Sequence, residues 1–551
     1  MSNFSFKTAK ARSIVLLAFL LFVFSGCEAS RPEEAAAPKA VIVNASVCGV
    51  MVPVSGSLAE VPVEGVEISF EFTREIILPD IISADVSFSG GALSASYGKD
   101  KSVLVLRPEG KLSHFTKYSI SIGAGEHFGV NLLESSRVEF TTAYNPADKF
   151  ERLPDEELLT LVQRQTFKYF WDYAHPLCGL ARERLGSENT VAIGGSGFGI
   201  MGIPVAVERG FISREQAVER MRKILGFLGG KAQRFHGAYP HWIDGGSGAV
   251  IPFSAKDNGG DLVETAFLIQ GLLAVSGYFD RPEEEDIRSA IDAIWRGVEW
   301  DWYTRGGKSL YWHWSPSQEW AMNMSISGWN EGLIVYVLAA SSPTHPVSKD
   351  VYEQGWARGG GIRNGRKFYG VTLPLGSDYG GPMFFAHYSF MGLDPRGLKD
   401  AYASYWEQNT AHARINFEYC RANPKGHAGY SDVCWGLTAS DIPGGYSASS
   451  PTNDKGVIAP TAALASYPYV PEESLAAMRT FYYMYGDRMW GEYGFFDAMC
   501  LDKAWFAPSY IAIDQGPIVV MIENGRTGLL WDCFMKHPDV LKGLNALGFS
   551  R

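Results

Sequence analysis

Cysteine is scarce in this sequence, and none of it is arranged to hold a metal ion. The seven cysteines are scattered over 551 residues, with no CxxC pair and no histidine at metal-ligand spacing. Apart from Cys27 in the N-terminal segment, six remain. They are consistent with one or two disulfides in an oxidising compartment, and equally with a set of small buried apolar residues.

Basic clusters are missing beyond the first residues, and the net charge is −11. This excess of acid argues against nucleic acids and other polyanions as ligands. The GxSxG, HExxH and P-loop signatures are absent, and the glycine-rich run 194–199 lacks the strand–helix context of a dinucleotide site. We therefore expect no cofactor, no bound metal and no nucleic-acid partner.

Beyond the N-terminus the sequence also lacks an apolar run long enough to span a membrane. The run 14–24 follows three basic residues, is too short to cross a bilayer comfortably, and leads to Cys27. It resembles a bacterial lipoprotein signal, although Phe24 stands where leucine is usual. We expect a signal peptide over 1–27 with lipidation of Cys27, a flexible tether over 28–40, and a lipid-anchored location in the cell envelope, at the periplasmic face or the outer-membrane surface.

Aromatic residues, in contrast, are abundant. They make up 13% of the chain and include 15 tryptophans and 26 tyrosines. Trp and Tyr combine a flat apolar face with a polar edge, which suits the faces of sugar rings. Large helical proteins also use tryptophan in their cores, so the composition alone leaves both interpretations open.

Residues 41–145 are predicted to form a small all-β domain. Val66, Ile68, Phe70 and Phe72 alternate with polar residues, and Gly and Pro break the pattern at regular intervals. Several short strands over such a length favour a β-sandwich. The segment resembles bacterial Ig-like domains, which usually serve as spacers or supports. Sugar binding is the alternative, and the absence of tryptophan from this segment disfavours it.

After a linker near 145–148, the apolar period changes from two to 3.6, and residues 150–551 are predicted to be mainly α. Ser213 and Gln216 have capping-box spacing at the start of one helix. About twelve helices without a βαβ pattern favour antiparallel pairs closed into an (α/α)6 barrel, and an open α-solenoid is disfavoured because no repeat of 30–45 residues is visible. The predicted helices span 154–173, 197–208, 213–229, 261–279, 283–301, 327–341, 379–391, 398–421, 458–467, 471–485, 515–524 and 527–547.

Three carboxylates, Asp257, Asp261 and Glu264, precede or begin the apolar helix 261–279. Because Asp261 and Glu264 are three residues apart, we expect them on one face of the first helical turn. Such a cluster of like charges is easier to keep where water, a metal or a polar substrate is present. The alternative is a solvated acidic turn that complements the helix dipole.

Two further carboxylates are candidates for acid–base chemistry. Glu331 lies between Trp329 and a strongly apolar helix, where burial would raise its pKa. The alternative is a glutamate that satisfies only the helix dipole. Asp514 precedes another apolar helix and is either its N-cap, a base facing a cavity, or both. Glycosidic hydrolysis needs such a pair, one group to protonate the leaving oxygen and one to activate water or attack the sugar.

Aromatic and polar residues in the intervening loops are the candidates for substrate binding, since loop positions favour ligand contact. For any one ring, packing over a helix end is the alternative. The candidates are Tyr239, His241, Trp242, Trp312, Trp314, Trp329, Asn330, Tyr379, Tyr446 and Gln515.

Six motifs occur in order from about residue 150 onward: QTFKYFW (165–171), GFG (197–199), YPHW (239–242), DNGGDLVET (257–265), GWNE (328–331) and AIDQGP (512–517). With these motifs, about 70% of the chain resembles the bacterial glycoamylase-like domain of glycoside hydrolase family 144. The resemblance implies an (α/α)6 barrel and inverting hydrolysis of β-1,2-glucan by endo- or exo-acting enzymes, with Asp257, Asp261, Glu264, Glu331 and Asp514 around the cleaved bond.

Within this resemblance we expect Glu331 to be the general acid and Asp514 the base or the water-positioning group. The other three carboxylates would bind substrate hydroxyls and tune the pair. We favour exo action with release of sophorose, because the loops 236–256 and 436–457 are long enough to wall off one end of a cleft. The alternatives are an endo-β-1,2-glucanase, an α-glucan glucoamylase and a non-catalytic glycan-binding lipoprotein. We expect a monomer.

Overall fold

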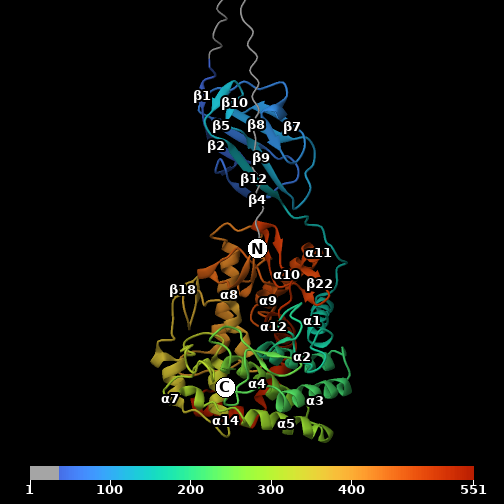
Figure 1. Cartoon of the computed structure of the whole chain (residues 1–551), viewed down its shortest axis with the longest axis vertical. Coiled ribbons are helices and arrows are strands. Elements are labelled where there is room, and N and C mark those ends of the chain that lie inside the picture. The colour runs from blue at the N-terminus through green and yellow to red at the C-terminus, as the bar shows by residue number, and fades with distance from the viewer. Residues whose placement is uncertain (1–35) are drawn as a thin grey trace, which may run out of the picture.

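The structure, a computed structural model, describes residues 36–551, so the expected signal segment and Cys27 lie outside the described residues. It combines an N-terminal β-sheet region with a predominantly helical region (Figure 1). The strands of the first region end at Thr142, and the first helix begins at Asp155. The chain is therefore a mixed helix-and-sheet protein in which the sheets come first.

The N-terminal region consists of two packed sheets around one hydrophobic core. One sheet has the strand order β3-β2-β5-β8-β7, the other β4-β12-β9-β6, and β1-β11-β10 form a small third sheet. All pairs are antiparallel except β4–β12 and β1–β11. The strands are β1 Lys39–Ala40, β2 Ile42–Val47, β3 Val50–Val52, β4 Ser57–Val61, β5 Ile68–Phe72, β6 Val86–Phe88, β7 Leu93–Tyr97, β8 Val103–Pro108, β9 Lys117–Ile122, β10 Gly125–His127, β11 Val130–Leu132 and β12 Ser136–Thr142.

The second region is built from helices joined by long loops that carry short hairpins. The helices are α1 Asp155–Trp171, α2 Ile193–Glu208, α3 Arg214–Gly230, α4 Leu262–Tyr278, α5 Glu285–Arg296, α6 Leu333–Ser341, α7 Lys349–Val351, α8 Tyr405–Ala422, α9 Pro460–Leu464, α10 Pro471–Arg479, α11 Gly486–Met489, α12 Ala512–Arg526, α13 Leu529–Met535 and α14 Pro538–Leu547. The loop strands are β13 Thr190–Ala192, β14 Trp242–Asp244, β15 Val250–Ile251, β16 Gly260–Asp261, β17 His313–Trp314, β18 Lys367–Phe368, β19 Val371–Thr372, β20 Ala439–Ile442, β21 Gly445–Ala448, β22 Trp490–Gly491, β23 Gly494–Phe495, β24 Met499–Cys500 and β25 Trp505–Phe506.

Several helices differ from their predicted extents, and the backbone explains why. The segment predicted as 379–391 cannot begin as a helix, because Gly380 and Gly381 both have φ near +90°, and its remainder contains two 3-10 turns, Met383–Ala386 and Tyr388–Phe390. The predicted helix 527–547 is two helices, α13 and α14, interrupted where Pro538 begins the second. The capping box of Ser213 and Gln216 at the start of α3 is confirmed.

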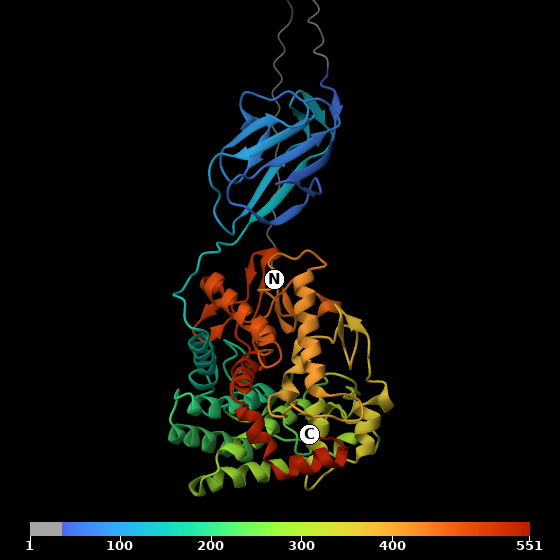
Figure 2. The ribbon, with the colours of Figure 1, turned by 180° about the vertical axis from the view of Figure 1, so that it is seen from behind.

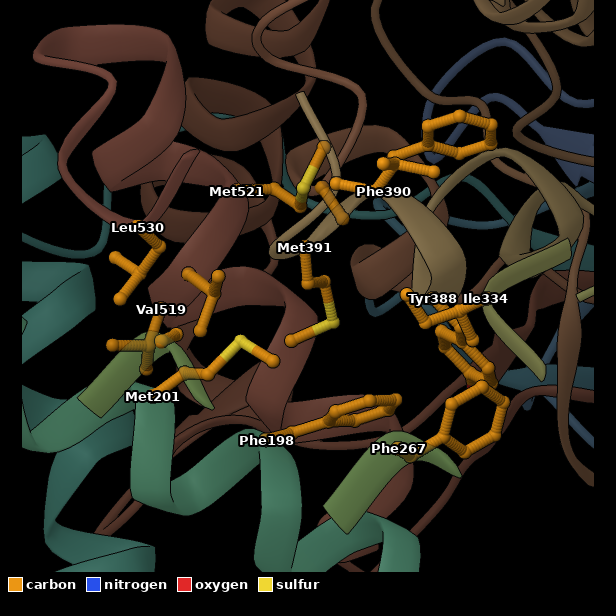
Figure 3. Close-up of a cluster of buried hydrophobic side chains, with 14 of the residues drawn as sticks. Phe198, Met201, Phe267, Ile334, Tyr388, Phe390, Met391, Val519, Met521 and Leu530 are labelled. Atoms are coloured by element: carbon orange, nitrogen blue, oxygen red, sulfur yellow. The ribbon is translucent and has the colours of Figure 1, made fainter. Parts of the chain in front are cut away.

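Glycines allow α2 and α4 to pack in direct backbone contact. A Cβ atom on Gly197 would lie 2.4 Å from the carbonyl oxygen of Phe267, and one on Gly271 would lie 2.3 Å from that of Gly197. This close approach is the structural role of the glycine-rich run 194–199. Figure 3 shows Phe198 and Phe267, one from each helix, gathered beside Tyr388. The ring centroids of these residues lie 5.0 and 5.5 Å from that of Tyr388, which fixes the tyrosine in the core.

The sheet region sits on the end of the helical region that carries α11, and α14 lies at the opposite end (Figures 1 and 2). Phe115 packs edge-on against Phe506, with 5.6 Å between ring centroids, and Tyr144 packs against Tyr485 at 5.0 Å. The backbone N–H of Gly429 donates to Glu60 at 2.9 Å. These contacts dock the two regions through aromatic rings and hydrogen bonds.

Within residues 36–551, no helix combines the length and the apolar character that crossing a membrane requires. The six cysteines of this part of the chain are all free, and five of them are buried. In the structure the five buried cysteines therefore act as small core residues, the second of the two interpretations that their spacing allows, whereas Cys48 is exposed.

The helix contact through Gly197 predicts a position-specific effect of alanine. Gly197→Ala should destabilise the fold by about 1–3 kcal/mol or more, because the added methyl group meets backbone atoms that have no room to move. Gly226→Ala is the matched control: this glycine is exposed on α3 with open space around it, and alanine there should stabilise by about 0.5–1 kcal/mol. Urea denaturation of both variants tests the pair, and equal stabilities would contradict the packing argument.

Candidate functional site

A cavity of about 400 Å³ opens where the loops of the helical region meet the first turns of α4 and α12. Its size is within the range of roughly 300–1,000 Å³ that small-molecule sites occupy. Both long loops that were expected to form a wall contribute to it, the first through His241, Trp242 and Phe253, and the second through Tyr446 on β21 and its neighbours. Aromatic side chains and carboxyl groups therefore meet around one space.

Asp261 organises one side of this cavity. It is fully buried and is the N-cap of α4, where its Oδ1 accepts hydrogen bonds from the N–H groups of Val263 at 3.0 Å and Glu264 at 2.9 Å. Its Oδ2 accepts from His241 Nδ1 at 3.0 Å and from Trp312 Nε1 at 3.2 Å. Asp261 thus does not share an exposed face with Glu264 but orients two side chains that line the cavity.

His241 is a cation of the site, close to Glu264, Asp261 and Asp257. Burial lowers the pKa of its imidazole, but the negative charges of Glu264, Asp261 and Asp257 outweigh this and raise the pKa to about 9. The ring is therefore protonated at neutral pH. Phe253, which is half exposed, stacks on it with 4.2 Å between ring centroids.

Asp257 lies behind the cavity between two histidines. Its Oδ2 is 3.8 Å from His241 Nδ1, and its Oδ1 is 3.1 Å from His313 Nε2. Donor atoms of His241, Asp257 and Asp261 converge within 4.8 Å of one another, as they would around a cation. The imidazole proton, however, already occupies the position between the nitrogen and Asp261, so a metal ion would have to displace it.

Glu264 and Glu331 both line the cavity, and they differ in how they are held. Burial raises the pKa of Glu264 to about 7, and its Oε2 accepts from the N–H of Gly194 at 2.7 Å. Burial also raises the pKa of Glu331 to about 7. In the part of the chain that is described, no other residue donates a hydrogen bond to the Glu331 carboxyl group. The carboxyl group of Glu331 is therefore less constrained by hydrogen bonds than that of Glu264.

Asp514 does not line the cavity, contrary to the expectation of a base facing it directly. It is 1% exposed and lies in the first turn of α12, whose N-cap is Ile511, so the N-cap assignment for Asp514 was also wrong. Its Oδ1 accepts from the hydroxyl group of Tyr388 at 3.3 Å, and Tyr388 does line the cavity. Burial raises the pKa of Asp514 well above its usual value, and the neighbouring Asp497 adds to this.

The candidate binding residues divide into two groups. His241, Trp242, Trp312 and Tyr446 line the cavity. Tyr239 does not, because it is fully buried and its hydroxyl group donates to the carbonyl oxygen of Leu228 at 3.1 Å.

The remaining candidates also belong to packing and turns instead of the cavity lining. Trp329 is buried against Trp356 and Tyr405, Tyr379 packs on Phe368, and Trp314 meets His236 edge-on. The Asn330 side chain accepts from the N–H of Gly332 in a turn, and Gln515 donates to the carbonyl oxygen of Phe495.

The structure also adds residues that the sequence patterns did not single out. Arg184 lines the cavity and forms ion pairs with Glu183 at 3.0 Å and with Asp441 at 3.3 Å. Asp497 lies behind them and accepts from the N–H of Asp441 at 2.6 Å. Asp441 belongs to the loop 436–457, which was expected to form a wall, but nothing local in the sequence marks the other three residues.

Comparisons with known proteins agree on one family. The family model Glycoamylase ("Putative glucoamylase") matches residues 323–538. An exo β-1,2-glucooligosaccharide sophorohydrolase (non-reducing end) of Parabacteroides distasonis is 44% identical over 470 residues, which cover 81% of this chain and 65% of that protein. The chain thus spans just under two thirds of the length of this curated relative.

Two solved structures extend the match. An endo-β-1,2-glucanase from Chitinophaga pinensis is 51% identical, with a TM-score of 0.71 over 73% of this chain and 99% of that one. A β-1,2-glucanase from Parabacteroides distasonis is 39% identical, with a TM-score of 0.70 over 92% of this chain and 74% of that one. These similarities confirm the resemblance drawn from the motifs: the chain belongs to the family of GH144-type β-1,2-glucanases.

Proposed function

We propose that this protein is a glycoside hydrolase that cleaves β-1,2-glucan. The observation that carries the proposal is the Glu331 carboxyl group, which lines an aromatic cavity with its pKa raised by burial to about 7. A general acid must hold its proton near neutral pH and release it to the leaving oxygen. The names of the three relatives described above, each of which refers to a β-1,2-linked glucan or glucooligosaccharide, supply the substrate class.

The reaction then needs a proton donor and a proton acceptor on opposite sides of the bond. Glu331 gives its proton to the glycosidic oxygen as the bond to the anomeric carbon breaks. A water molecule forms the new bond to that carbon and loses a proton toward Asp514, which the cavity reaches through Tyr388. Attack by water in a single displacement inverts the anomeric configuration. The starting state is restored when Asp514 releases this proton to solvent and Glu331 takes up another.

The other cavity residues fit substrate binding. Trp242, Trp312 and Tyr446 offer flat faces and polar edges to sugar rings, and Phe253 adds an exposed ring over His241. The protonated imidazole of His241 is a donor toward sugar hydroxyls that offsets the charge of the surrounding carboxylates. No cofactor takes part in this proposal.

We favour exo action with release of sophorose. The curated relative is an exo-acting sophorohydrolase. In addition, the ion pair between Arg184 and Asp441 connects the hairpin β20–β21 to the loop that carries Arg184. This connection supports a cavity that is closed at one end. Endo action is the second candidate, because the Chitinophaga relative, at 51% identity, is an endo-β-1,2-glucanase.

The architecture suits this role if the helices close into an (α/α)6 barrel, which we also propose. In support, α4 packs on α2 and α6, and α12 packs on α2 and α9. These contacts place α9, α12, α2, α4 and α6 next to one another in that order, as neighbouring inner helices of a barrel would be. The N-terminal sheets would be an Ig-like support. The sequence of residues 1–27 supports a lipid-anchored enzyme of the cell envelope, and we expect a monomer.

Glu331→Gln should lower kcat/KM on β-1,2-glucan by about 10²–10⁴-fold, because glutamine cannot donate a proton to the leaving oxygen. Glu264→Gln is the matched control, since its carboxyl group has the same raised pKa but is bonded to Gly194. Glu264→Gln should lower kcat/KM by a smaller factor than Glu331→Gln. Reducing-sugar assays measure both, and unchanged turnover in Glu331→Gln would remove this residue from the mechanism.

The pH dependence follows from the same group. Because Glu331 acts in its protonated form and its pKa is about 7, kcat/KM should fall by about tenfold per pH unit once the pH rises above that value. Activity measured from acid to alkaline pH on soluble β-1,2-glucan shows this limb. A rate that still increased well above pH 8 would rule out an acid of this kind.

Product analysis identifies substrate and mode of action together. Incubation with linear β-1,2-glucan followed by chromatography should yield a single disaccharide, sophorose, from the first time points onward. A ladder of oligosaccharides would instead establish the endo mode. Starch is the control substrate: sugar released only from starch would make the protein a glucoamylase, and binding without release from either would make it a glycan-binding protein.

A further inference from the structure

A second group of aromatic side chains lies outside the cavity, on the surface of the helical region. Trp302 is 40% exposed and is the only exposed tryptophan within residues 36–551. Its ring stacks on the imidazole of His236, with 3.7 Å between centroids and 13° between planes. Trp314 meets Trp302 edge-on at 6.0 Å, and the ring of Trp320 lies 6.3 Å from that of Trp302. We call His236, Trp302, Trp314 and Trp320 the aromatic platform.

Polar contacts hold the platform from behind. His236 Nδ1 is 2.8 Å from a carboxylate oxygen of Glu299, which orients the imidazole under Trp302. The guanidinium group of Arg305 lies over the ring of Trp320, 5.2 Å from its centroid, and donates to Asn323 at 2.7 Å. A surface whose rings are already ordered loses little conformational entropy when a ligand binds to it.

The polar edges of the three indole rings are free to bind a ligand. Within residues 36–551, the N–H groups of Trp302, Trp314 and Trp320 donate to no protein atom, and none of the three is among the buried atoms that lack a partner. Each of them therefore reaches solvent. Flat apolar faces with N–H donors along their edges suit sugar rings. Exposed apolar patches that are rimmed by polar groups mark interaction sites and ligand-binding grooves.

Two segments of the chain connect the platform to the cavity. Trp312 lines the cavity, and Trp314 on β17 follows it two residues later, about 7 Å further along an extended segment. His241 also lines the cavity, and His236 lies five residues before it on the same loop. A polymer that leaves the cavity on this side therefore passes over the platform.

We propose that the aromatic platform is a second binding site, which holds the part of a β-1,2-glucan chain that extends out of the cavity. This inference rests on the hydrolase function proposed above and deepens it, because it gives a place to the sugar units beyond the cleaved bond. The platform binds by stacking and by hydrogen bonds from its indole N–H groups, so it takes no part in proton transfer. It therefore determines how tightly a long chain is bound and leaves the chemical step unchanged.

The length of the substrate separates the platform from the cavity. Trp302→Ala should raise KM for long linear β-1,2-glucan by about three- to tenfold with kcat unchanged, because the stacking of one ring is lost equally in the ground state and the transition state. For the trisaccharide of the same linkage, kcat/KM should stay within about twofold, because only one of its sugar units remains beyond the cleaved bond when a disaccharide is released. Trp302→Phe keeps a flat ring and should fall between Trp302→Ala and the unmodified protein.

Tyr369→Ala is the matched control. Tyr369 is exposed to a similar degree, 42%, but lies in the turn of the β18–β19 hairpin, outside both the cavity and the platform. Its removal should change neither KM nor kcat/KM with either substrate, and thermal denaturation checks that each variant keeps its fold. If Trp302→Ala has no effect on long glucan, or affects the trisaccharide equally, the inference is wrong.

A binding measurement separates this inference from the proposed function. In native electrophoresis through gels that contain linear β-1,2-glucan, Glu331→Gln should be retarded, and the double variant with Trp302→Ala should be retarded less. Equal retardation of the two, or none, would overturn the platform even if the unmodified protein cleaves the glucan. Retardation that depends on Trp302, in a protein that does not cleave the glucan, would refute the proposed function and support the platform.

Discussion

The arrangement of the cavity wall depends on Asp261, because each of its carboxylate oxygens accepts two hydrogen bonds. Two backbone N–H groups at the start of α4 and two side chains, those of His241 and Trp312, share its oxygens. The hydrogen bond to Asp261 is also one of the causes that raise the pKa of the His241 imidazole. Removing Asp261 would release one wall of the cavity and the first turn of a central helix together.

The acidic groups near the cavity fall into two groups according to their surroundings. Asp261 and Asp441 have cationic or N–H partners, whereas burial raises the pKa of Glu331 and of Asp514. Acid–base catalysis needs such a division, because one group must give a proton while another takes one. In this chain, burial and neighbouring charges produce the difference, since all four residues carry the same functional group.

Much of the site was predictable from local sequence, and the misses have physical causes. Asp257, Asp261 and Glu264 could be found because three acids before an apolar helix are conspicuous, although the N-cap role of Asp261 was not recognised. Arg184 and Asp497 could not be found, since their partners lie far away in the chain and are brought near only by the fold.

Aromatic residues were the least predictable part of the site. Tyr239 and Trp242 are three residues apart in one loop, yet the first is buried and the second lines the cavity. A loop has no fixed period from which the direction of a side chain follows. The predicted helix extents were wrong mainly where glycine or proline interrupts the periodic pattern, as at Gly380 and Pro538.

The spacing between α2 and α4 has a consequence for the chemistry of the cavity. A methyl group on Gly194 would lie 2.6 Å from Glu264 Oε2, so the carboxyl group occupies the space of the missing side chain. The hydration of this acid is therefore set by how tightly two helices fit together. Any strain that separates the two helices would admit solvent and lower the pKa of Glu264. The proton affinity of Glu264 is therefore coupled to the packing of α2 on α4.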